Sequence, residues 1–356
     1  MSKVRVLVIG CGNMGSSHAR AYHKLDEFEL VGIVDGFRPN VEKFNKSVGH
    51  EYPYFSDFAQ ALAELKPDAV AVCTYPKTHE PLAIQAMEAG CHVFVEKPIA
   101  ADVAGAERVI AAAKKYNKKV LVGYILRHHP SWKKFIELAR NLGKPLVMRM
   151  NLNQQSHGTT WDWHKNLLKS LTPVVDCGCH YVDVMCQMTG AKPVRVSGIS
   201  ARVSDEIPGD QRNYGQLQVV FDDGSVGWYE AGWGPMISTN AFFVKDVFGP
   251  KGCVSICAKS EREAKSDDIN SHTKTNTLRF HSSEVAANGE FAKEDEWIDT
   301  KDEPDHDGLC AREQLFLHKA ITEDIDMSQH LQDALNSLKI VLAADESAKT
   351  GKTIEL

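Results

Sequence analysis

The sequence predicts an α/β protein with two domains, a doubly wound parallel sheet followed by an α/β domain with a largely antiparallel sheet. Three observations support this class. Short β-branched runs alternate with helical patterns over residues 1–124. From residue 125 on, strand patterns mostly follow one another without helices between them. The chain has 356 residues, enough for two domains of ~150 residues each.

Five apolar runs in the first part of the chain are typical of strands buried on both faces, because a covered parallel sheet leaves no polar alternation. These runs are 4–9, 30–34, 69–73, 92–95 and 120–122. Helical patterns begin near Met14, span 40–48, follow the candidate N-cap Ser56, span 80–89 before Gly90, and span 102–116. The alternation predicts a doubly wound first domain over residues 1–124.

The second predicted domain covers residues 125–356. We expect strands at 147–153, 194–203, 214–221, 226–231, 241–248, 253–257 and 278–281, and helices at 131–141, 309–322 and 329–349. Residues 222–225, Asp-Asp-Gly-Ser, form a hairpin signal in which Gly224 can take a positive φ. The weakly apolar stretch 259–277 is expected to be a loop. We expect the C-terminal helix to be able to pack back on the first domain.

Composition and charge exclude several classes of protein. Apolar residues make up 43% and charged residues 25%, which excludes a disordered or collagen-like chain. A net charge of −6 argues against a nucleic-acid partner. No apolar run approaches the ~18 residues of a membrane span. Nine cysteines without a Cys-x-x-Cys motif, and no signal-peptide pattern, predict free thiols and a cytoplasmic location. The Cys177-Gly-Cys179-His180 spacing matches no common zinc motif, so no metal is expected.

A Gly-x-Gly-x-x-Gly motif spans residues 10–15, between the first predicted strand and a helix. Its glycines permit a tight turn, the close approach of a pyrophosphate and close helix–strand packing. The helix N-terminus adds unpaired N–H groups and the positive end of a dipole. The alternative is a plain turn. We expect this loop to bind a dinucleotide through Gly10, Gly12, Asn13 and Met14.

Asp35 ends the next predicted strand, at the position from which a carboxylate binds the adenosine ribose. A carboxylate there favours two ribose hydroxyls and repels a 2′-phosphate, so NAD is expected over NADP. Arg38 could weaken that preference by pairing with a phosphate or stacking on adenine. The alternative is a surface aspartate without a ligand.

Lys97 lies in Glu96-Lys97-Pro98, at the carboxyl end of a predicted strand, where open α/β sheets bind ligands. Its ammonium could bind a substrate oxygen, or it could be an exposed lysine without function. Asp176, His180 and Asp183 lie at i, i+4 and i+7 in the apolar segment 174–188, which has a helical pattern. A histidine there could act as a general base near neutral pH, or be satisfied within the core.

These motifs together resemble the Gfo/Idh/MocA oxidoreductases, which include inositol dehydrogenases and glucose–fructose oxidoreductase. The resemblance covers the whole chain, and the ordered combination of its motifs is specific. The matching residues are Gly10, Gly12, Gly15, Asp35, Thr74, Tyr75, Pro76, His79, Glu96, Lys97, Pro98, Gly123, Tyr124, Arg127, His129, Pro130, Asp176, Gly178, His180, Asp183 and Ala348 to Lys352. Where many members carry a glycine run, this chain has Leu171-Thr-Pro-Val174, which makes its substrate harder to infer.

The resemblance implies a Rossmann domain and a second domain with a large, mostly antiparallel open sheet whose exposed face usually pairs subunits, so a homodimer or homotetramer is expected. It implies further cofactor contacts from five residues: Thr74, Pro76, His79, Glu96 and Lys97. It also implies catalysis by Lys97, Asp176 and His180, with Tyr124 and Arg127 near the substrate.

The implied activity is NAD(P)-dependent oxidation of a secondary hydroxyl of a cyclitol, sugar or sugar derivative, or the reverse reduction. Trp161, Asp162 and His164 suit a carbohydrate ring, although they could equally form a packed aromatic loop. Two other activities stay open. One is a glycosidase that retains NAD and oxidises its sugar transiently, and the other is a non-catalytic dinucleotide-binding sensor.

Overall fold

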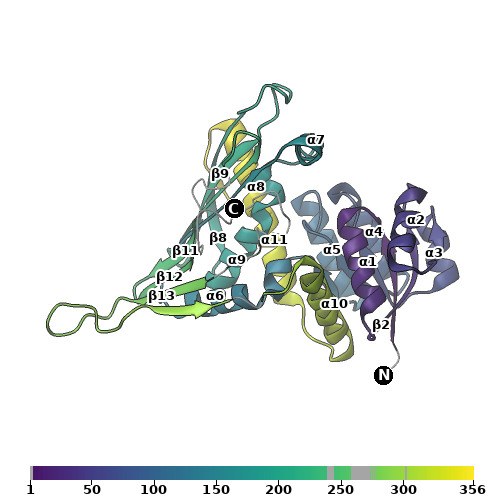
Figure 1. The fold of residues 1–356 in the computed structure, drawn as a ribbon, viewed down its shortest axis with the longest axis horizontal. Coiled ribbons are helices and arrows are strands. Elements are labelled where there is room, and N and C mark those ends of the chain that lie inside the picture. Colours follow the sequence, from purple (N-terminus) through teal and green to yellow (C-terminus); the bar gives the residue numbers. More distant parts are fainter. Residues whose placement is uncertain (1–2, 239–243, 258–272, 274, 276, 301–302) are drawn as a thin grey trace. The chain divides into compact units, whose positions relative to one another are not determined.

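The computed structural model describes residues 3–238, 244–257, 273, 275, 277–300 and 303–356. The chain forms two compact units (Figure 1). The first consists of Met1–Ile125 with Pro304–Leu335, and the second of Leu126–Glu303 with Asn336–Leu356. The first compact unit includes Pro304–Leu335, which lies beyond the predicted first domain. The predicted domain limits, 1–124 and 125–356, therefore stay a prediction.

The first unit is built on a parallel sheet of six strands in the order β3-β2-β1-β4-β5-β6. The strands are β1 Val4–Ile9, β2 Phe28–Val34, β3 Tyr54–Phe55, β4 Ala69–Val72, β5 His92–Val95 and β6 Val120–Val122. From β1 the chain adds strands first on one side, β2 and β3, and then on the other, β4 to β6. Doubly wound sheets bind ligands in the crevice at this switch point, between β1 and β4. The predicted doubly wound parallel sheet is confirmed.

Some helices of this unit begin with a side-chain cap. The helices of this unit are α1 Asn13–Lys24, α2 Arg38–Val48, α3 Phe58–Leu65, α4 Pro76–Glu88, α5 Val103–Tyr116, α10 His306–Thr322 and the first part of α11 Ser328–Thr350. The N-cap of α3 is Asp57, whose carboxylate accepts from the Gln60 N–H, so the expected cap at Ser56 was wrong by one residue. Asp102 caps α5 in the same way.

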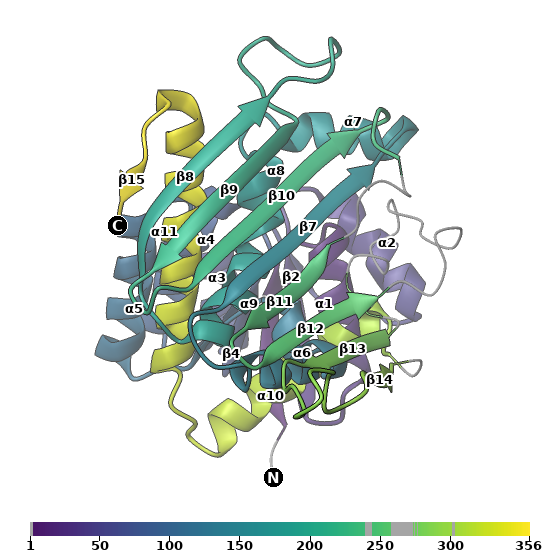
Figure 2. The same ribbon diagram turned by 90° about the vertical axis from the view of Figure 1, so that its left-hand side faces the viewer.

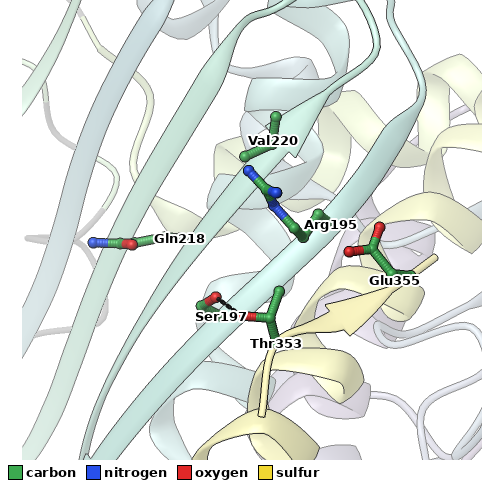
Figure 3. A pocket seen from close by; sticks show the side chains of 6 residues that line it. All are labelled: Arg195, Ser197, Gln218, Val220, Thr353 and Glu355. Carbon is green, nitrogen blue, oxygen red and sulfur yellow. Dashed lines mark hydrogen bonds between the residues drawn. The ribbon is translucent and has the colours of Figure 1, made fainter.

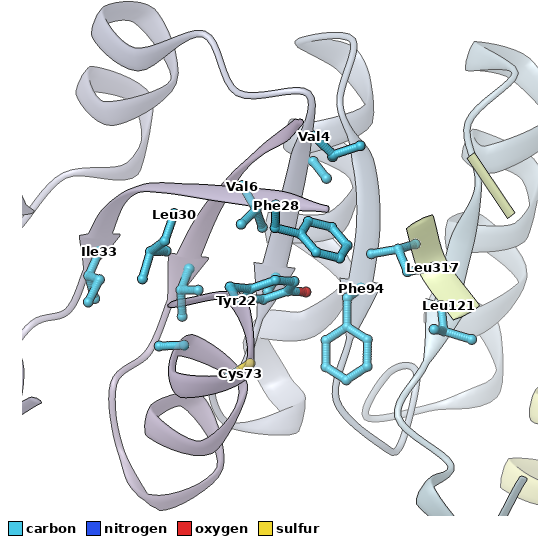
Figure 4. Close-up of a cluster of buried hydrophobic side chains, with 14 of the residues drawn as sticks. Val4, Val6, Tyr22, Phe28, Leu30, Ile33, Cys73, Phe94, Leu121 and Leu317 are labelled. Atoms are coloured by element: carbon cyan, nitrogen blue, oxygen red, sulfur yellow. The ribbon is translucent and has the colours of Figure 1, made fainter. Parts of the chain in front are cut away.

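The core of the first unit lies against the sheet and includes a residue from near the C-terminus. Tyr22 of α1 meets Phe28 of β2 edge to face, with ring centroids 4.9 Å apart. Figure 4 shows both rings in a cluster with Phe94 of β5 and Leu317 of α10. Each such buried side chain contributes ~1.5–3 kcal/mol, which ties α10 to the sheet and to α1.

The second unit is built on a sheet of nine strands in the order β14-β13-β12-β11-β7-β10-β9-β8-β15 (Figure 2). Every neighbouring pair is antiparallel except β7 and β10. The strands are β7 Val147–Gln155, β8 Pro193–Ala201, β9 Tyr214–Phe221, β10 Val226–Gly234, β11 Lys245–Gly249, β12 Gly252–Cys257, β13 Thr277–Ser282, β14 Glu296–Asp299 and β15 Ile354–Glu355. The predicted large, mostly antiparallel sheet is confirmed.

Helices of the second unit cover one face of this sheet. They are the 3-10 turn Ile125–His128, α6 Pro130–Arg140, α7 Gly158–Leu167, α8 Pro173–Asp176, α9 Gly178–Thr189 and the remainder of α11. Gly198 of β8 makes the approach of α11 possible, since a Cβ there would lie 2.2 Å from the Ala344 carbonyl oxygen. Within the part of the chain that the structure describes, no helix of this unit lies on the opposite face (Figure 2).

Three expectations need correction or lie outside the described residues. The helix expected over 174–188 is two helices, α8 and α9, which are separated at Cys177. Most of the loop expected at 259–277, and residues 241–243 of an expected strand, are not among the described residues. All nine cysteines are free thiols. Among the described helices, none has the length and apolarity needed to cross a membrane.

Candidate functional site

Two glycines of the loop lie against backbone too closely for a Cβ, and the third faces open space. Gly10 has φ +84°, and a Cβ there would lie 2.5 Å from the Cys73 carbonyl oxygen. A Cβ on Gly15 would lie 1.8 Å from the Gly10 carbonyl oxygen. A Cβ on Gly12 would meet nothing within 4 Å. Gly12 is also the N-cap of α1 and offers no side-chain cap. This open position at a helix N-terminus fits a pyrophosphate.

Asp35 connects the end of β2 to the glycine loop. Its Oδ2 accepts from the Cys11 N–H at 2.6 Å, and its Oδ1 accepts from the Phe37 N–H at 2.7 Å. Asn40 Nδ2 also approaches Oδ1 at 3.5 Å and Oδ2 at 3.4 Å. A carboxylate has about four acceptor positions, so room remains for a ribose hydroxyl. Arg38 instead donates to Glu42 at 2.9 Å and lies over the Tyr54 ring at 5.4 Å. The side chain of Arg38 is 66% exposed, which leaves it able to move.

His79 joins the loops that follow β4 and β5. It is wholly buried, with Nε2 2.9 Å from the Thr74 carbonyl oxygen and Nδ1 2.7 Å from the Pro98 carbonyl oxygen. Burial lowers the pKa of His79 despite these acceptors. Thr74 also shares a hydrogen bond with the Thr78 hydroxyl at 2.7 Å, just where Pro76 begins α4. His79 therefore shapes two loops at the carboxyl edge of the sheet.

Glu96 is a buried carboxylate that organises the backbone at Lys97. His18 Nε2 lies 2.7 Å from Glu96 Oε1, and the Lys97 N–H donates to Oε2 at 3.1 Å. Burial opposes ionisation of Glu96, but the hydrogen bond from His18 and nearby positive charge bring its pKa below the ordinary value. The Glu96 side chain thus lies inside the protein, while Lys97 is half-buried at the end of β5.

The second unit places Asp176 and His180 on either side of a helix break. Asp176 ends α8, and His180 lies in the first turn of α9 with 9% exposure. Gly178 begins α9 and packs closely on Tyr229, since a Cβ there would lie 3.1 Å from the Tyr229 ring. Asp176 and His180 therefore belong to different helices, although both remain at one short corner of the chain.

Arg127 and Asp183 form a bidentate ion pair in the second unit. Arg127 Nε donates to Asp183 Oδ2 at 2.8 Å and Nη2 donates to Oδ1 at 2.5 Å. Asp183 is fully buried and also accepts from Gln187 at 2.9 Å. In the first unit, Tyr124 is wholly buried, with its ring 6.4 Å from that of His330. The protein interior thus already engages both side chains that were expected near the substrate.

Two predicted substrate residues of α7 are buried and one is not. Trp161 is 4% exposed, and its indole N–H donates to Glu206 at 3.1 Å. Asp162 points to solvent and pairs with Lys165 at 3.0 Å. His164 is 2% exposed, and burial lowers its pKa to about 4. Among the described residues, His164 Nδ1 has no hydrogen-bond partner.

A stacked pair and an amide were not predicted from the sequence. His164 lies flat on Trp233 of β10, with centroids 4.5 Å apart and an interplanar angle of 1°. The Trp233 indole donates to Gln154 Oε1 at 2.8 Å, and the Cys177 thiol donates to the same oxygen at 3.5 Å. The Gln154 amide nitrogen is therefore left to donate to another group. It lies beside Cys177, the residue that follows Asp176. The only signal in the sequence was a polar residue at the end of a predicted strand.

A separate pocket of about 360 Å³ lies on the open face of the nine-stranded sheet (Figure 3). It is lined by Arg195, Ser197, Gln218, Val220, Thr353 and Glu355. Ser197 shares a hydrogen bond with Thr353 at 2.9 Å. None of the predicted site residues lines this pocket, and α8 and α9 cover the opposite face of the sheet. It is therefore not a candidate for the site predicted from the sequence.

Comparisons with known families match both parts of the chain. The profile described as "Oxidoreductase family, NAD-binding Rossmann fold" matches residues 4–124, and that described as "GFO/IDH/MocA C-terminal domain" matches residues 133–252. Myo-inositol 2-dehydrogenase of Thermotoga maritima is 32% identical over 149 residues, which cover 41% of this chain and 44% of that protein. D-glucoside 3-dehydrogenase of Escherichia coli is 28% identical over 220 residues, covering 61% and 62%. The chain thus matches less than two thirds of the length of these relatives.

Solved structures share the fold over nearly the full length. Aldose-aldose oxidoreductase from Caulobacter crescentus, complexed with glycerol, superposes with a TM-score of 0.79 at 21% identity and covers 100% of both chains. An oxidoreductase from Agrobacterium radiobacter, in complex with NAD+, L-tartaric acid and magnesium, has a TM-score of 0.76 at 16% identity and covers 99% and 98%. Together with the two profile matches, the glycine loop and the six-stranded sheet show that the chain belongs to the Gfo/Idh/MocA oxidoreductase family and carries its NAD-binding Rossmann domain.

Proposed function

We propose that the protein is an NAD-dependent dehydrogenase that oxidises a secondary hydroxyl of a cyclitol, sugar or sugar derivative, or catalyses the reverse reduction. The observation that carries this proposal is a pair of side chains in the second unit that can bind and transfer protons. A histidine and an aspartate stand at one helix corner, in a chain that has an NAD-binding domain. The named relatives act on inositol and on a glucoside, which supports this substrate class.

The cofactor is held by the glycine loop and Asp35 in this proposal. Bound NAD⁺ supplies the hydride acceptor. The N–H groups at the start of α1, from Asn13 and Met14, bind the pyrophosphate at the open position beside Gly12. Asp35 accepts from a ribose hydroxyl with the lone pairs that its contacts within the protein leave free. Its negative charge disfavours the 2′-phosphate of NADP.

His180 is the proposed general base. It takes the proton of the reacting hydroxyl as the attached carbon loses hydride, and in the reduction it returns that proton as an acid. The Lys97 ammonium stabilises the developing alkoxide and binds a hydroxyl. Asp176 accepts from a neighbouring hydroxyl or orients His180. Each role is one that the side chain's ordinary donors and acceptors permit.

The second unit supplies a platform for the substrate ring in this proposal. The Gln154 amide nitrogen donates to a substrate hydroxyl, because its oxygen is already fixed by Trp233 and Cys177. His164 stacks on Trp233 and keeps that indole in place. Trp161, Asp162, Tyr124 and Arg127 were also expected to line the site. Trp161 and Tyr124 are buried and Arg127 is paired with Asp183, so the role of these three is to support the shape of the site rather than to touch the substrate.

The open face of the nine-stranded sheet is the proposed surface for pairing with a second copy. Ile199 on β8, Phe248 on β11 and Trp297 on β14 are 60%, 40% and 60% exposed. Strand alternation puts all three on the face opposite the helices, since Gly198 and Val247 beside them are turned inward. Such a spread of large apolar groups is typical of an interface. A homodimer or homotetramer follows, which sedimentation of the intact chain tests.

The test of the proposed activity is a screen for NADH formation. The protein is incubated with NAD⁺ and a panel of cyclitols, aldoses and glycosides, and NADH is followed by its near-ultraviolet absorbance. Steady accumulation with at least one polyol supports the proposal. Hydrolysis of a glycoside without accumulation would identify an NAD-retaining glycosidase. NADH binding without any turnover would identify a sensor.

A further inference from the structure

A buried cluster of potential metal ligands joins α1 to α10 in the first unit. His18 of α1 meets Cys310 and Glu313 of α10, and one ligand atom of each lies within 4.8 Å of the others. Their exposures are 0%, 0% and 1%, so the interior fixes all three side chains. None of them has a role in the proposed dehydrogenase chemistry.

A third potential ligand on α10, His306, lies on the same helix face as Cys310 and Glu313. His306, Cys310 and Glu313 are spaced i, i+4 and i+7, which places them in a row. The ring nitrogens of His306 lie 3.8 and 4.0 Å from the Cys310 Sγ, and His306 is 7% exposed. With His18 from the facing helix, the row presents four donors of the N, S and O types.

Glu313 indicates that the cluster holds more than these side chains. Among the described residues, its Oε1 has no hydrogen-bond partner, although the side chain is buried. An unpaired polar atom in the interior costs about 1–3 kcal/mol, and such an atom often marks a bound ion or water.

His18 already has the surroundings of a metal-binding histidine. Its Nε2 lies 2.7 Å from Glu96 Oε1, and its Nδ1 accepts from the Gln314 amide at 2.9 Å. Metal-bound histidines almost always donate their second ring N–H to a carboxylate or carbonyl. Rotation of the Gln314 amide would release Nδ1 toward Cys310 and Glu313, while Glu96 keeps the ring in position.

We propose that His18, Cys310 and Glu313 bind a structural zinc ion, with His306 as the fourth ligand. Thiolate and imidazole ligands favour zinc over calcium or magnesium, which prefer oxygen. Tetrahedral ligands at ~2.0–2.3 Å from zinc are ~3.3–3.8 Å apart, so small side-chain rotations bring together the ligand atoms of His18, Cys310 and Glu313, which lie within 4.8 Å of one another. His306 must rotate further to complete the site. The thiol and the carboxylic acid each lose one proton to solvent, and the two anions neutralise Zn²⁺ in the interior.

This site differs from the sequence expectation of no metal because its ligands share no local motif. His18 and Cys310 come together only through the packing of α1 on α10. The site also stands apart from the proposed activity, since its loss affects the stability of the first unit and not the proton transfer at His180. Failure of one proposal therefore leaves the other intact.

The experiment uses the intact chain, expressed with zinc in the medium and purified without chelator. Metal content is measured by mass spectrometry, and thermal unfolding is measured with a chelator and with Zn²⁺ restored. Co²⁺ replaces zinc as a spectroscopic probe, because a Cys–Co²⁺ bond gives a near-ultraviolet charge-transfer band. The variants are Cys310→Ala and Glu313→Gln. Cys91→Ala is the matched control, since Cys91 is another buried thiol of this unit, bonded to the Pro67 carbonyl.

We expect one zinc per chain in the wild type and in Cys91→Ala. We expect Zn²⁺ at a hundredfold excess over Kd to raise their Tm by roughly 5–10 °C. Cys310→Ala should lack both the Co²⁺ band and the Tm response, and Glu313→Gln should bind much less zinc. A wild type that carries no zinc and shows no band or Tm response overturns the proposal, and a buried water then pairs with Glu313. A Glu313→Gln variant with full zinc content removes Glu313 from the ligand set.

Discussion

The Asp35 carboxylate accepts a hydrogen bond from the Cys11 N–H at 2.6 Å, so the residue that ends β2 holds the backbone of the glycine loop. The same side chain therefore has two tasks in our account. It fixes the loop that binds the pyrophosphate, and it presents negative charge to the adenosine ribose. Substitution of Asp35 should disturb both the preference between cofactors and the affinity for either one.

The first prediction is that NAD⁺ supports a higher kcat/KM than NADP⁺, and that Asp35→Ala reduces this preference by about 1–3 kcal/mol. The reason is that the carboxylate repels the 2′-phosphate. Steady-state kinetics with both cofactors measure it. Arg38→Ala is the control, because Arg38 pairs with Glu42 and should leave the preference for NAD⁺ in place. A wild type that prefers NADP⁺ contradicts the assignment and makes Arg38 the recognition residue.

The second prediction separates two glycines of one loop. Gly15→Ala should lower the unfolding free energy by about 1–3 kcal/mol, since its Cβ would lie 1.8 Å from the Gly10 carbonyl oxygen. Gly12→Ala should leave stability nearly unchanged, because nothing lies within 4 Å, but it should weaken NADH binding by filling the open position. Thermal unfolding and NADH fluorescence titration measure the two effects. Equal NADH affinity in Gly12→Ala and wild type would place the pyrophosphate elsewhere.

The third prediction concerns the pH dependence of stability at His164. Burial lowers its pKa from 6.5 to about 4, so the unfolded chain binds a proton over a range in which the folded chain does not. The wild type should therefore lose stability as pH falls from about 6.5 to about 4, by up to about 3 kcal/mol from this residue. His164→Phe keeps a ring against Trp233 and removes the proton site. Calorimetry across this range should show a shallower loss for the variant, and parallel curves would count against a neutral buried His164.

The fourth prediction assigns substrate binding to Gln154. Gln154→Ala should raise KM for the best polyol about 3- to 10-fold with little change in kcat, the effect of one lost hydrogen bond. Gln155→Ala is the matched control, because alternation along β7 turns its side chain to the other face. Steady-state kinetics of both variants measure the split. A similar KM in Gln154→Ala and Gln155→Ala would show that the amide at 154 only supports Trp233.

The sequence predicted those features whose cause is local. Residues 4–9, 92–95 and 120–122 agree with β1, β5 and β6 at both ends, since a strand buried on both faces is a continuous apolar run. The glycine loop was also visible, because Gly10 has a positive φ and Gly15 has no room for a Cβ. The two-residue strands β3 and β15 were missed, since two residues form no pattern. The edge strand β14 was missed because its sequence, Glu-Trp-Ile-Asp, has a charged residue at each end.

Features that arise from tertiary contacts could not be predicted. The break between α8 and α9 at Cys177 lies inside a segment whose apolar pattern is helical throughout, so the pattern does not reveal it. Gln154 and Trp233 are neighbours only because β7 and β10 pair in parallel with these two residues in register. The expected cap at Ser56 failed for a smaller reason, since Asp57 stands next to it and is an equally good cap.

The fifth prediction concerns Lys97 and its relation to His180. Lys97→Met should lower kcat and weaken substrate binding, because the ammonium binds hydroxyls in the ground state as well as the developing alkoxide. The fall in kcat caused by Lys97→Met should not add to the fall caused by His180→Ala in the double variant, since groups that serve one proton transfer act as a unit. Single-turnover kinetics of the four proteins measure this. Fully additive losses would show that the two residues act in separate steps.

The most direct test of the central claim is the turnover of His180→Ala on the best polyol, measured beside NADH binding. Our account predicts that kcat falls by ~10²-fold or more, because proton transfer loses its base. NADH affinity should stay nearly that of the wild type, and wild-type kcat/KM for oxidation should rise with pH through a single ionisation. If His180→Ala turns over at a rate near that of the wild type, His180 is a structural residue and the proposed mechanism is wrong.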